Sequence, residues 1–305
     1  MAVFTVLLGK IVWLYLLIVL GWVAGTVVGV KREPVANLLL YTLSPIVAFE
    51  GASMVPLSAA SFSLPFLFFV LCSVLCGVFF LAAKPLWQDG TRNLAAFASA
   101  DGNTGYFGIP VALALLGEGS LGFIILGSLG FLLYESTVGF FVLARGNFTV
   151  RESVLKLLRL PLLYAFIAGI LFQFLHLTMP EGAPAVLANV RGAYSVLGMM
   201  VIGLGLTGLD LSAVDVRLLS FTSITKFLVW PLIVIGLIRL DDSFFRFFTG
   251  DMHKAMLLLS VVPLAVNTVI LSTVLGVQPR KAAVAVFMST LLALFVIPIM
   301  ATFFF

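Results

Sequence analysis

The sequence predicts an all-α membrane protein with ten transmembrane helices, arranged as two inverted five-helix repeats. Three observations carry this prediction: the composition, the spacing of long apolar segments, and the distribution of Lys and Arg between the loops. Hydrophobic residues make up 62% of the chain and charged residues only 10%, whereas a soluble domain is about 25% charged. A soluble fold of 305 residues cannot bury so much apolar surface, so we expect the chain to lie in a bilayer.

Ten apolar segments are long enough to cross that bilayer. A spanning helix needs about 20 largely apolar residues, and the loops between the segments are short. The expected segments comprise residues 4–29, 35–53, 63–84, 93–117, 121–144, 160–178, 189–209, 217–239, 253–276 and 281–303.

The fourth and ninth segments each carry a proline and an Asn-Thr pair in the middle of an apolar run. They read "ASADGNTGYFGIP", with Asn103-Thr104 and Pro110, and "LSVVPLAVNTVI", with Pro263 and Asn267-Thr268. A proline removes one helical hydrogen bond and clashes with the preceding turn. Irregular backbone survives at membrane depth only inside protein or beside a wet cavity. The sequence therefore predicts two broken helices at matching places in the two halves of the chain.

The two breaks lie about half a chain apart, which indicates an internal repeat. We expect residues 1–150 to form the first five-helix repeat and residues 151–305 the second. An odd number of helices per repeat inverts the second repeat in the membrane. Eleven Lys and Arg fall in the loops on one side and four on the other, so the positive-inside rule places both termini outside the cytoplasm.

Such breaks have a defined electrostatic character. The half-helix that starts near Pro110 is expected to point free N–H groups into the gap, where they favour an anion such as a carboxylate. The half-helix that ends near Asp101 presents carbonyl groups, which suit a cation or a proton-bearing group. The candidate substrate-binding residues are Asn103, Thr104, Gly105, Gly108, Pro110, Pro263, Asn267 and Thr268. The alternative is a proline kink filled by neighbouring side chains.

Four ionisable residues inside or near apolar segments are candidates for a coupling ion or a charge pair: Asp101, Glu135, Glu50 and Lys226. Each is costly in a membrane unless it is paired or faces a cavity. Asp101 could carry a coupling proton or help to hold a sodium ion. Alternatively, hydration near an interface accounts for the two glutamates, and snorkelling accounts for Lys226. No spacing indicates a metal site, an organic cofactor, a catalytic nucleophile or a nucleotide-binding loop.

Several motifs resemble the auxin efflux carrier family of transporters. "NTGYFGIPVALALLGEGSLG" looks like the fourth-helix motif of that family, and "SVVPLAVNTVILSTVLGVQPRKAAVAVFMSTLLALFVIPI" looks like its ninth and tenth helices. "LSPIVAF" and "KFLVWPL" also fit. The resemblance implies a scaffold of helices 1, 2, 6 and 7, which often forms a homodimer. It also implies that the broken helices 4 and 9 cross near the centre, and that helices 3–5 and 8–10 form a moving transport domain with elevator-like motion.

The residues and the resemblance together predict a gradient-driven carrier of small organic anions, such as malate, other dicarboxylates or auxin-like carboxylates. The long central hydrophilic loop of many plant members is absent, which indicates a compact prokaryotic-type member in the inner cell membrane. We expect a small carboxylate and the lipid bilayer as partners, with no nucleic acid and no enzymatic activity. The alternatives are a sodium-coupled symporter of the bile-acid type, a channel, and a membrane-embedded enzyme.

Overall fold

The computed structural model describes residues 13, 15–54, 59–116, 121–208 and 214–304. Within these ranges the chain is helical and contains no strand. The helices up to residue 158 are α2 (Arg32–Leu38), α3 (Ser44–Ser53), α4 (Ala59–Ala82), α5 (Thr91–Ala100), α6 (Ile109–Leu115), α7 (Leu121–Tyr134), α8 (Phe140–Ala144) and α9 (Val150–Leu158). The later helices are α10 (Pro161–Phe174), α11 (Ala183–Gly205), α12 (Val216–Ile224), α13 (Trp230–Leu240), α14 (Gly250–Val261), α15 (Asn267–Val274) and α16 (Pro279–Phe304). Wider π-helical turns are η1 (Ala24–Val28), η2 (Leu39–Leu43), η3 (Thr104–Gly108), η5 (Glu135–Gly139), η7 (Thr225–Val229) and η8 (Asp241–Phe245).

Helices long and apolar enough to cross a membrane confirm a multi-pass membrane protein. The described residues contain six of them, or seven if α9 and α10, which meet at 44°, form one span. The expected segments 93–117 and 253–276 are both broken, so neither half alone reaches the length of a bilayer. The number of ten crossings and the inverted repeat stay predictions, and the start of the first expected segment lies outside the described residues.

The side chains follow an inside-out pattern that suits lipid. Large apolar side chains point outward, with Phe66 on α4 68% exposed and Phe174 on α10 65% exposed. By contrast, Asp101 and Lys226 are completely buried. Exposed apolar surface on this scale is favourable only against an apolar solvent, so the outer surface of these helices faces the bilayer.

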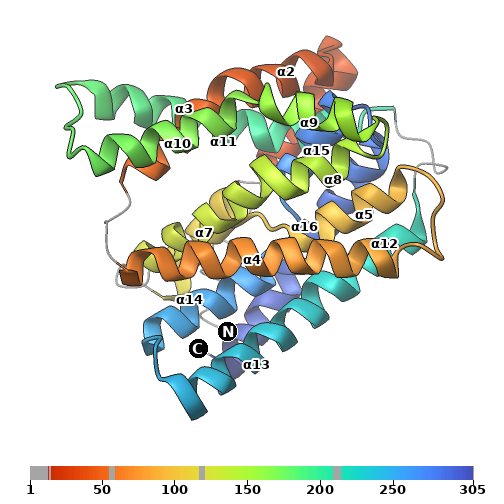
Figure 1. Ribbon diagram of the computed structural model, residues 1–305. Helices are drawn as coiled ribbons and strands as arrows, with labels where there is room; N and C mark the ends of the chain where they lie inside the picture. Colours follow the sequence, from red (N-terminus) through yellow and green to blue (C-terminus); the bar gives the residue numbers. More distant parts are fainter. Residues whose placement is uncertain (1–12, 14, 55–58, 117–120, 209–213, 305) are drawn as a thin grey trace.

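The helices form two groups in space (Figure 1). In the first group, α3 packs along α10 and α11 contacts both α2 and α3. In the second group, α4 packs against α5 and α7, and α14 packs against α7 and α13. The short helix α15 contacts α2 and α11 of the first group as well as α16 of the second. The second broken helix therefore lies at the boundary between the two groups.

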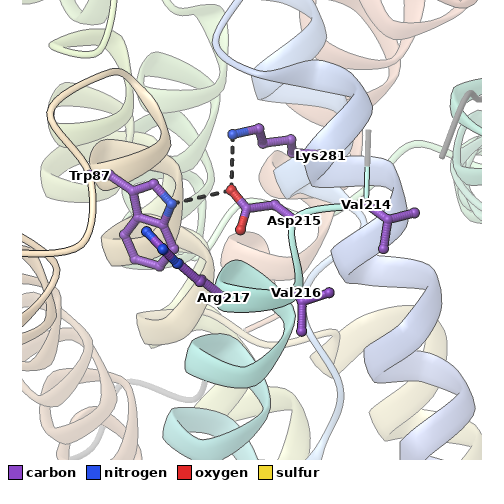
Figure 2. A pocket seen from close by; sticks show the side chains of 6 residues that line it. All are labelled: Trp87, Val214, Asp215, Val216, Arg217 and Lys281. Atoms are coloured by element: carbon purple, nitrogen blue, oxygen red, sulfur yellow. Dashed lines mark hydrogen bonds and ion pairs between the residues drawn. The ribbon is translucent and has the colours of Figure 1, made fainter. Parts of the chain in front are cut away.

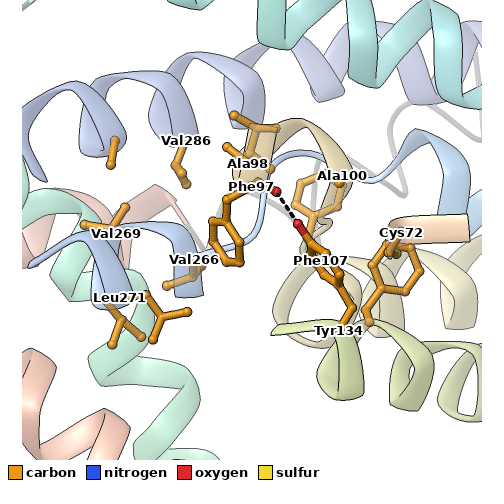
Figure 3. Packing of buried hydrophobic residues seen from close by; sticks show 14 of the residues in the cluster. Cys72, Phe97, Ala98, Ala100, Phe107, Tyr134, Val266, Val269, Leu271 and Val286 are labelled. Atoms are coloured by element: carbon orange, nitrogen blue, oxygen red, sulfur yellow. Dashed lines mark hydrogen bonds between the residues drawn. The ribbon is translucent and has the colours of Figure 1, made fainter. Parts of the chain in front are cut away.

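The core around α5 is built from small and aromatic side chains. The stretch "NLAAFASA" is buried almost throughout, and its alanines let neighbouring helices approach closely. The ring of Phe97 stacks on that of Tyr134, with ring centroids 5.9 Å apart. The Tyr134 hydroxyl also donates to the Phe97 carbonyl at 3.3 Å (Figure 3). This packing holds α5 and α7 together just before the first break.

Candidate functional site

The two broken helices meet at their breaks. The first break comprises Asp101–Asn103, between α5 and η3, and the second comprises Val262–Val266, between α14 and α15. The backbone N–H of Asn103 donates to the carbonyl of Pro263 at 2.8 Å. A direct hydrogen bond between the two breaks shows that the two segments cross, as the resemblance implied.

The first break is a tight turn whose freed backbone groups find partners. Asn103 has φ −75° and ψ 68°, and the N–H of Thr104 donates to the carbonyl of Gly102 at 2.8 Å. This geometry is an inverse γ-turn. One turn earlier, the indole N–H of Trp230 donates to the carbonyl of Ser99 at 2.7 Å. The end of α5 is therefore closed by a side chain rather than by water, as an interior at membrane depth requires.

The position of the first break differs from the sequence prediction, which placed the new half-helix near Pro110. The helix restarts at Thr104 as η3, and Pro110 is near the start of α6, which continues η3. The π-helical turn accommodates the hydrogen bond that proline cannot make. The chain breaks instead at Asp101-Gly102-Asn103, where an acidic side chain, a glycine and an amide favour a turn.

The second break does lie at its proline. Pro263 has no N–H to offer, and the next free N–H, that of Leu264, donates to the Ser289 hydroxyl of α16 at 3.1 Å. The new half-helix begins at Asn267, so both half-helices restart at an Asn-Thr pair, with Asn103 as the residue that precedes η3. The amides and hydroxyls of the two pairs are thereby brought to the crossing.

Two buried carboxyl groups lie in contact beside the first break. Asp101 follows the last residue of α5 and Glu135 opens η5, and their side chains interact directly. The Gly102 N–H donates to Asp101 Oδ1 at 2.8 Å. The Asn267 amide donates to Glu135 Oε2 at 2.5 Å, and the Tyr194 hydroxyl donates to Asn267 Oδ1 at 2.9 Å. The carboxyl pair thus connects the first break to the second and to α11.

The ammonium group of Lys226 lies beside the first break, next to Gly102. Its Nζ is 4.7 Å from the ring centre of Trp230 and 5.5 Å from that of Phe131, and aromatic faces attract cations. A Cβ atom added to Gly102 would come 2.8 Å from Nζ, so only glycine allows the ammonium to approach the backbone so closely. Lys226 therefore does not snorkel to an interface.

We call Asp101, Asn103, Glu135, Lys226 and Asn267 the break cluster. Several of its polar atoms have no hydrogen-bond partner among the described residues, namely Asp101 Oδ2, Asn103 Nδ2 and Lys226 Nζ. The nearby hydroxyls of Ser99 and Thr268 likewise have no hydrogen-bond partner among the described residues. Buried polar atoms without partners cost free energy, so a site that keeps several together is suited to binding a polar or charged ligand.

Of the remaining candidate residues, some lie where the two breaks meet and others lie apart from the break cluster. Thr104 and Gly108 are buried at the crossing, with Gly108 against Val262, whereas Gly105 is exposed. Glu50 lies on α3, apart from the break cluster, and forms an ion pair at 2.7 Å with Arg191 on α11. Glu50 and Arg191 therefore form a charge pair that joins α3 to α11 within the first group.

A second polar cluster lies at the start of α12 and lines an open hollow of about 430 Å³ (Figure 2). Lys281 Nζ donates to Asp215 Oδ2 and to the Thr91 hydroxyl, both at 3.0 Å. The indole of Trp87 donates to the same carboxylate oxygen at 3.2 Å. Burial raises the pKa of Asp215, but hydrogen bonds from Lys281, the Leu218 N–H and Trp87 outweigh it and lower that pKa overall. We call Trp87, Thr91, Asp215 and Lys281 the rim cluster.

A third group of ionisable side chains closes the turn between α13 and α14. The ligand atoms of Asp241, Asp242 and His253 lie within 4.8 Å of one another, which is compatible with a metal ion. However, Asp241 already accepts from the N–H groups of Phe247 and Phe248 at 2.9 and 3.1 Å and pairs with His253 at 3.0 Å. Its carboxylate therefore stabilises the turn.

Three side chains that the sequence analysis did not single out complete the site: Tyr194, Trp230 and Ser289. Tyr194 and Ser289 come from α11 and α16, far from the breaks in sequence, and no local pattern marks them. Trp230 follows Lys226 by four residues, and positions four apart share one helix face. This spacing in the sequence could have predicted that the Lys226 ammonium lies beside the Trp230 ring.

Comparison with known proteins supports a transporter. The chain is 26% identical over 300 residues to the uncharacterized transporter MJ1031 of Methanocaldococcus jannaschii, and the match covers 94% of this chain and 96% of that protein. No family sequence model matches the chain. Because the similarity covers nearly the full length of both proteins, it agrees with a multi-pass membrane architecture for the whole chain.

Proposed function

We propose that the protein is a gradient-driven carrier of small organic anions, of the auxin efflux carrier type. The crossing of two broken helices carries this proposal, because it places the Lys226 ammonium and the Asn103 amide, both without hydrogen-bond partners among the described residues, at one buried point. An ammonium and an amide donor are suited to a carboxylate. The candidate substrates are malate, other dicarboxylates and auxin-like carboxylates.

Transport requires the buried site to open to each side in turn. Asp101 and Lys226 are closed from solvent in this conformation, so a substrate reaches them only after a rearrangement. We propose that the group containing α4, α5, α7 and α14 moves against the group containing α2, α3, α10 and α11, in an elevator-like manner. The latter group is the scaffold and the proposed surface for a homodimer. An inner-membrane location with both termini outside belongs to the same proposal.

The test is transport by the purified protein in liposomes. Labelled malate, malonate and indole-acetate are offered to the wild type and to Asn103→Ala. We expect the variant to lose about tenfold in uptake, the effect of one hydrogen bond to a charged group. Asn189→Ala is the matched control, because Asn189 is exposed on α11. Full activity of Asn103→Ala would contradict the proposed binding site.

Two other functions make different predictions in the same liposomes. A sodium-coupled symporter of the bile-acid type would need sodium outside for uptake. A channel would give single-channel currents, whereas a carrier turns over too slowly to give measurable single-molecule currents. The break cluster favours a carrier over a channel, since its charged groups are buried and closed from solvent rather than arranged along an open pore.

A further inference from the structure

The carboxyl pair Asp101–Glu135 poses a problem of charge. Both side chains are buried, with Asp101 0% and Glu135 5% exposed, and they are in contact. Asp101 Oδ2 has no hydrogen-bond donor among the described residues. If both groups were ionised, two negative charges would touch in a dry interior, which is strongly unfavourable. One proton between them converts the same contact into a short O–H···O hydrogen bond.

Among the described residues, the surroundings of the pair supply only one balancing charge. The ammonium of Lys226 interacts with Asp101 across the break. The other titratable groups that face the pair belong to α4, α7 and α11 and are thiols and phenols, which are neutral at pH 7. They are Cys72, Cys76, Tyr134 and Tyr194. The cluster is therefore electrically neutral when the two carboxyl groups share a single proton.

A metal cation is a poorer occupant of this position than a proton. Hard cations bind through several oxygen atoms. The groups that touch the pair from outside are instead the Gly102 N–H and the Asn267 amide NH₂, and the Lys226 ammonium lies close by. These groups are hydrogen-bond donors, and they repel or fail to coordinate a cation.

We propose that the Asp101–Glu135 pair is the proton-coupling site of the carrier, an inference that rests on the proposed function. A carboxylate that binds beside Lys226 adds one negative charge to the neutral cluster. The ionised oxygen of the pair restores neutrality by taking a second proton from water on the side where the anion enters. When the site opens to the other side, the anion leaves and this proton returns to water. One proton thus moves in the same direction as each bound carboxylate.

Infrared spectroscopy of the purified, substrate-free protein tests the shared proton directly. The wild type is expected to show the C=O band of a buried protonated carboxyl at pH 7. Asp101→Asn and Glu135→Gln should both lose it, because the one remaining carboxylate then balances Lys226 without a proton. Lys226→Met should instead strengthen the band, since both carboxyls then need protons. Glu50→Gln is the control, because Glu50 is a buried carboxylate paired with Arg191, and it should keep the wild-type band.

A wild type without this band, or the same band in both carboxyl variants, would overturn the shared proton. Poor folding would weaken the band in every variant. A band that is lost in the two carboxyl variants and stronger in Lys226→Met therefore reports the shared proton.

Liposomes with a pH gradient test the coupling. With the membrane potential held at zero by valinomycin and equal potassium on both sides, an inward gradient of one pH unit should accumulate labelled malonate about tenfold, because one proton then carries the free energy of a tenfold concentration ratio. Nigericin should abolish the accumulation. Glu135→Gln should equilibrate malonate without accumulating it, and Glu50→Gln should behave as the wild type. Wild-type uptake that ignores the gradient would overturn the coupling while leaving the carrier function intact. If malate, malonate and indole-acetate all stay outside the wild-type liposomes, the proposed function fails. The infrared band then still tests whether Asp101 and Glu135 share a proton.

Discussion

The break cluster and the rim cluster each contain a lysine close to an aspartate, yet they satisfy these groups in opposite ways. In the rim cluster, Lys281 donates to Asp215 and to Thr91, and Asp215 accepts further bonds from Trp87 and from the Leu218 N–H. In the break cluster, the Lys226 ammonium lies against aromatic faces and near the Asp101 carboxyl, but it has no hydrogen-bond partner among the described residues.

We expect this difference to separate a structural role from a binding role. A polar network with every partner in place holds helices together, and the rim cluster joins α12 and α16 to the loop before α5. A charged group whose donors are unused has interaction energy left for a ligand. We therefore expect substitutions in the break cluster to change transport first, and those in the rim cluster to change stability first.

The largest expected effect is that of Lys226→Met, which removes the one balancing charge of the break cluster. Removal of one charged partner from a buried binding site weakens ligand binding by about 3 kcal/mol, or roughly 100-fold. Malonate uptake in liposomes should fall by about that factor. The counterpart Lys281→Met, which makes the same change in the rim cluster, should retain uptake. Equal losses in the two variants would remove the distinction between the clusters.

A smaller effect is expected from Gly102→Ala. The new methyl group would come 2.8 Å from Lys226 Nζ and 2.8 Å from Val262 Cγ2, which is too close for either atom to stay in place. Overpacking of this kind costs about 1–3 kcal/mol, so uptake should fall about tenfold through displacement of the ammonium. Gly77→Ala on α4 is the control, because nothing lies within 4 Å of its new methyl group. Wild-type uptake in Gly102→Ala would show that the close approach of Lys226 to the break is unimportant.

The rim cluster should respond in stability. Lys281→Met removes two hydrogen bonds, one to the Asp215 carboxylate and one to the neutral Thr91 hydroxyl; each contributes about 1.5–3 kcal/mol because the donor is charged. Thermal unfolding of the detergent-solubilised variant should begin several degrees below that of the wild type. Lys226→Met should not reproduce this shift if its ammonium is held only by ring faces and the nearby carboxylate. An unchanged unfolding temperature in Lys281→Met would show that the rim network is incidental.

The smallest effect concerns pH. The pKa of Asp215 is lowered in the folded protein, so its contribution to stability is present above the ordinary aspartate pKa of about 4. That contribution is lost as the pH falls through the lowered value, since the carboxyl must then accept a proton. Unfolding temperatures of the wild type and Asp215→Asn should therefore differ at pH 7 and at pH 5, and the difference should shrink as the pH falls below about 4. A difference that is constant over this range would exclude Asp215 as its source.

The sequence predicted the two broken segments more accurately than the position of the break within the first of them. It predicted that the segments containing Pro110 and Pro263 are broken, because proline and glycine inside apolar runs have a local physical cost. It placed the first break near Pro110, whereas the break is at Asp101-Gly102-Asn103. A local pattern cannot tell whether a proline breaks a helix or is accommodated by a π-helical turn next to it.

Composition, apolar segment length and the broken motifs depend only on the chain, because transfer of each residue between water and lipid is a local property. The sequence by itself therefore determined a multi-pass helical membrane protein with two interrupted segments. The tertiary structure decided which polar groups meet, pairing Asp101 with Glu135, Glu50 with Arg191 and Asn103 with Pro263 across more than thirty residues of chain each. Such contacts depend on helix packing, in which small side chains far apart in the sequence set how closely two backbones approach.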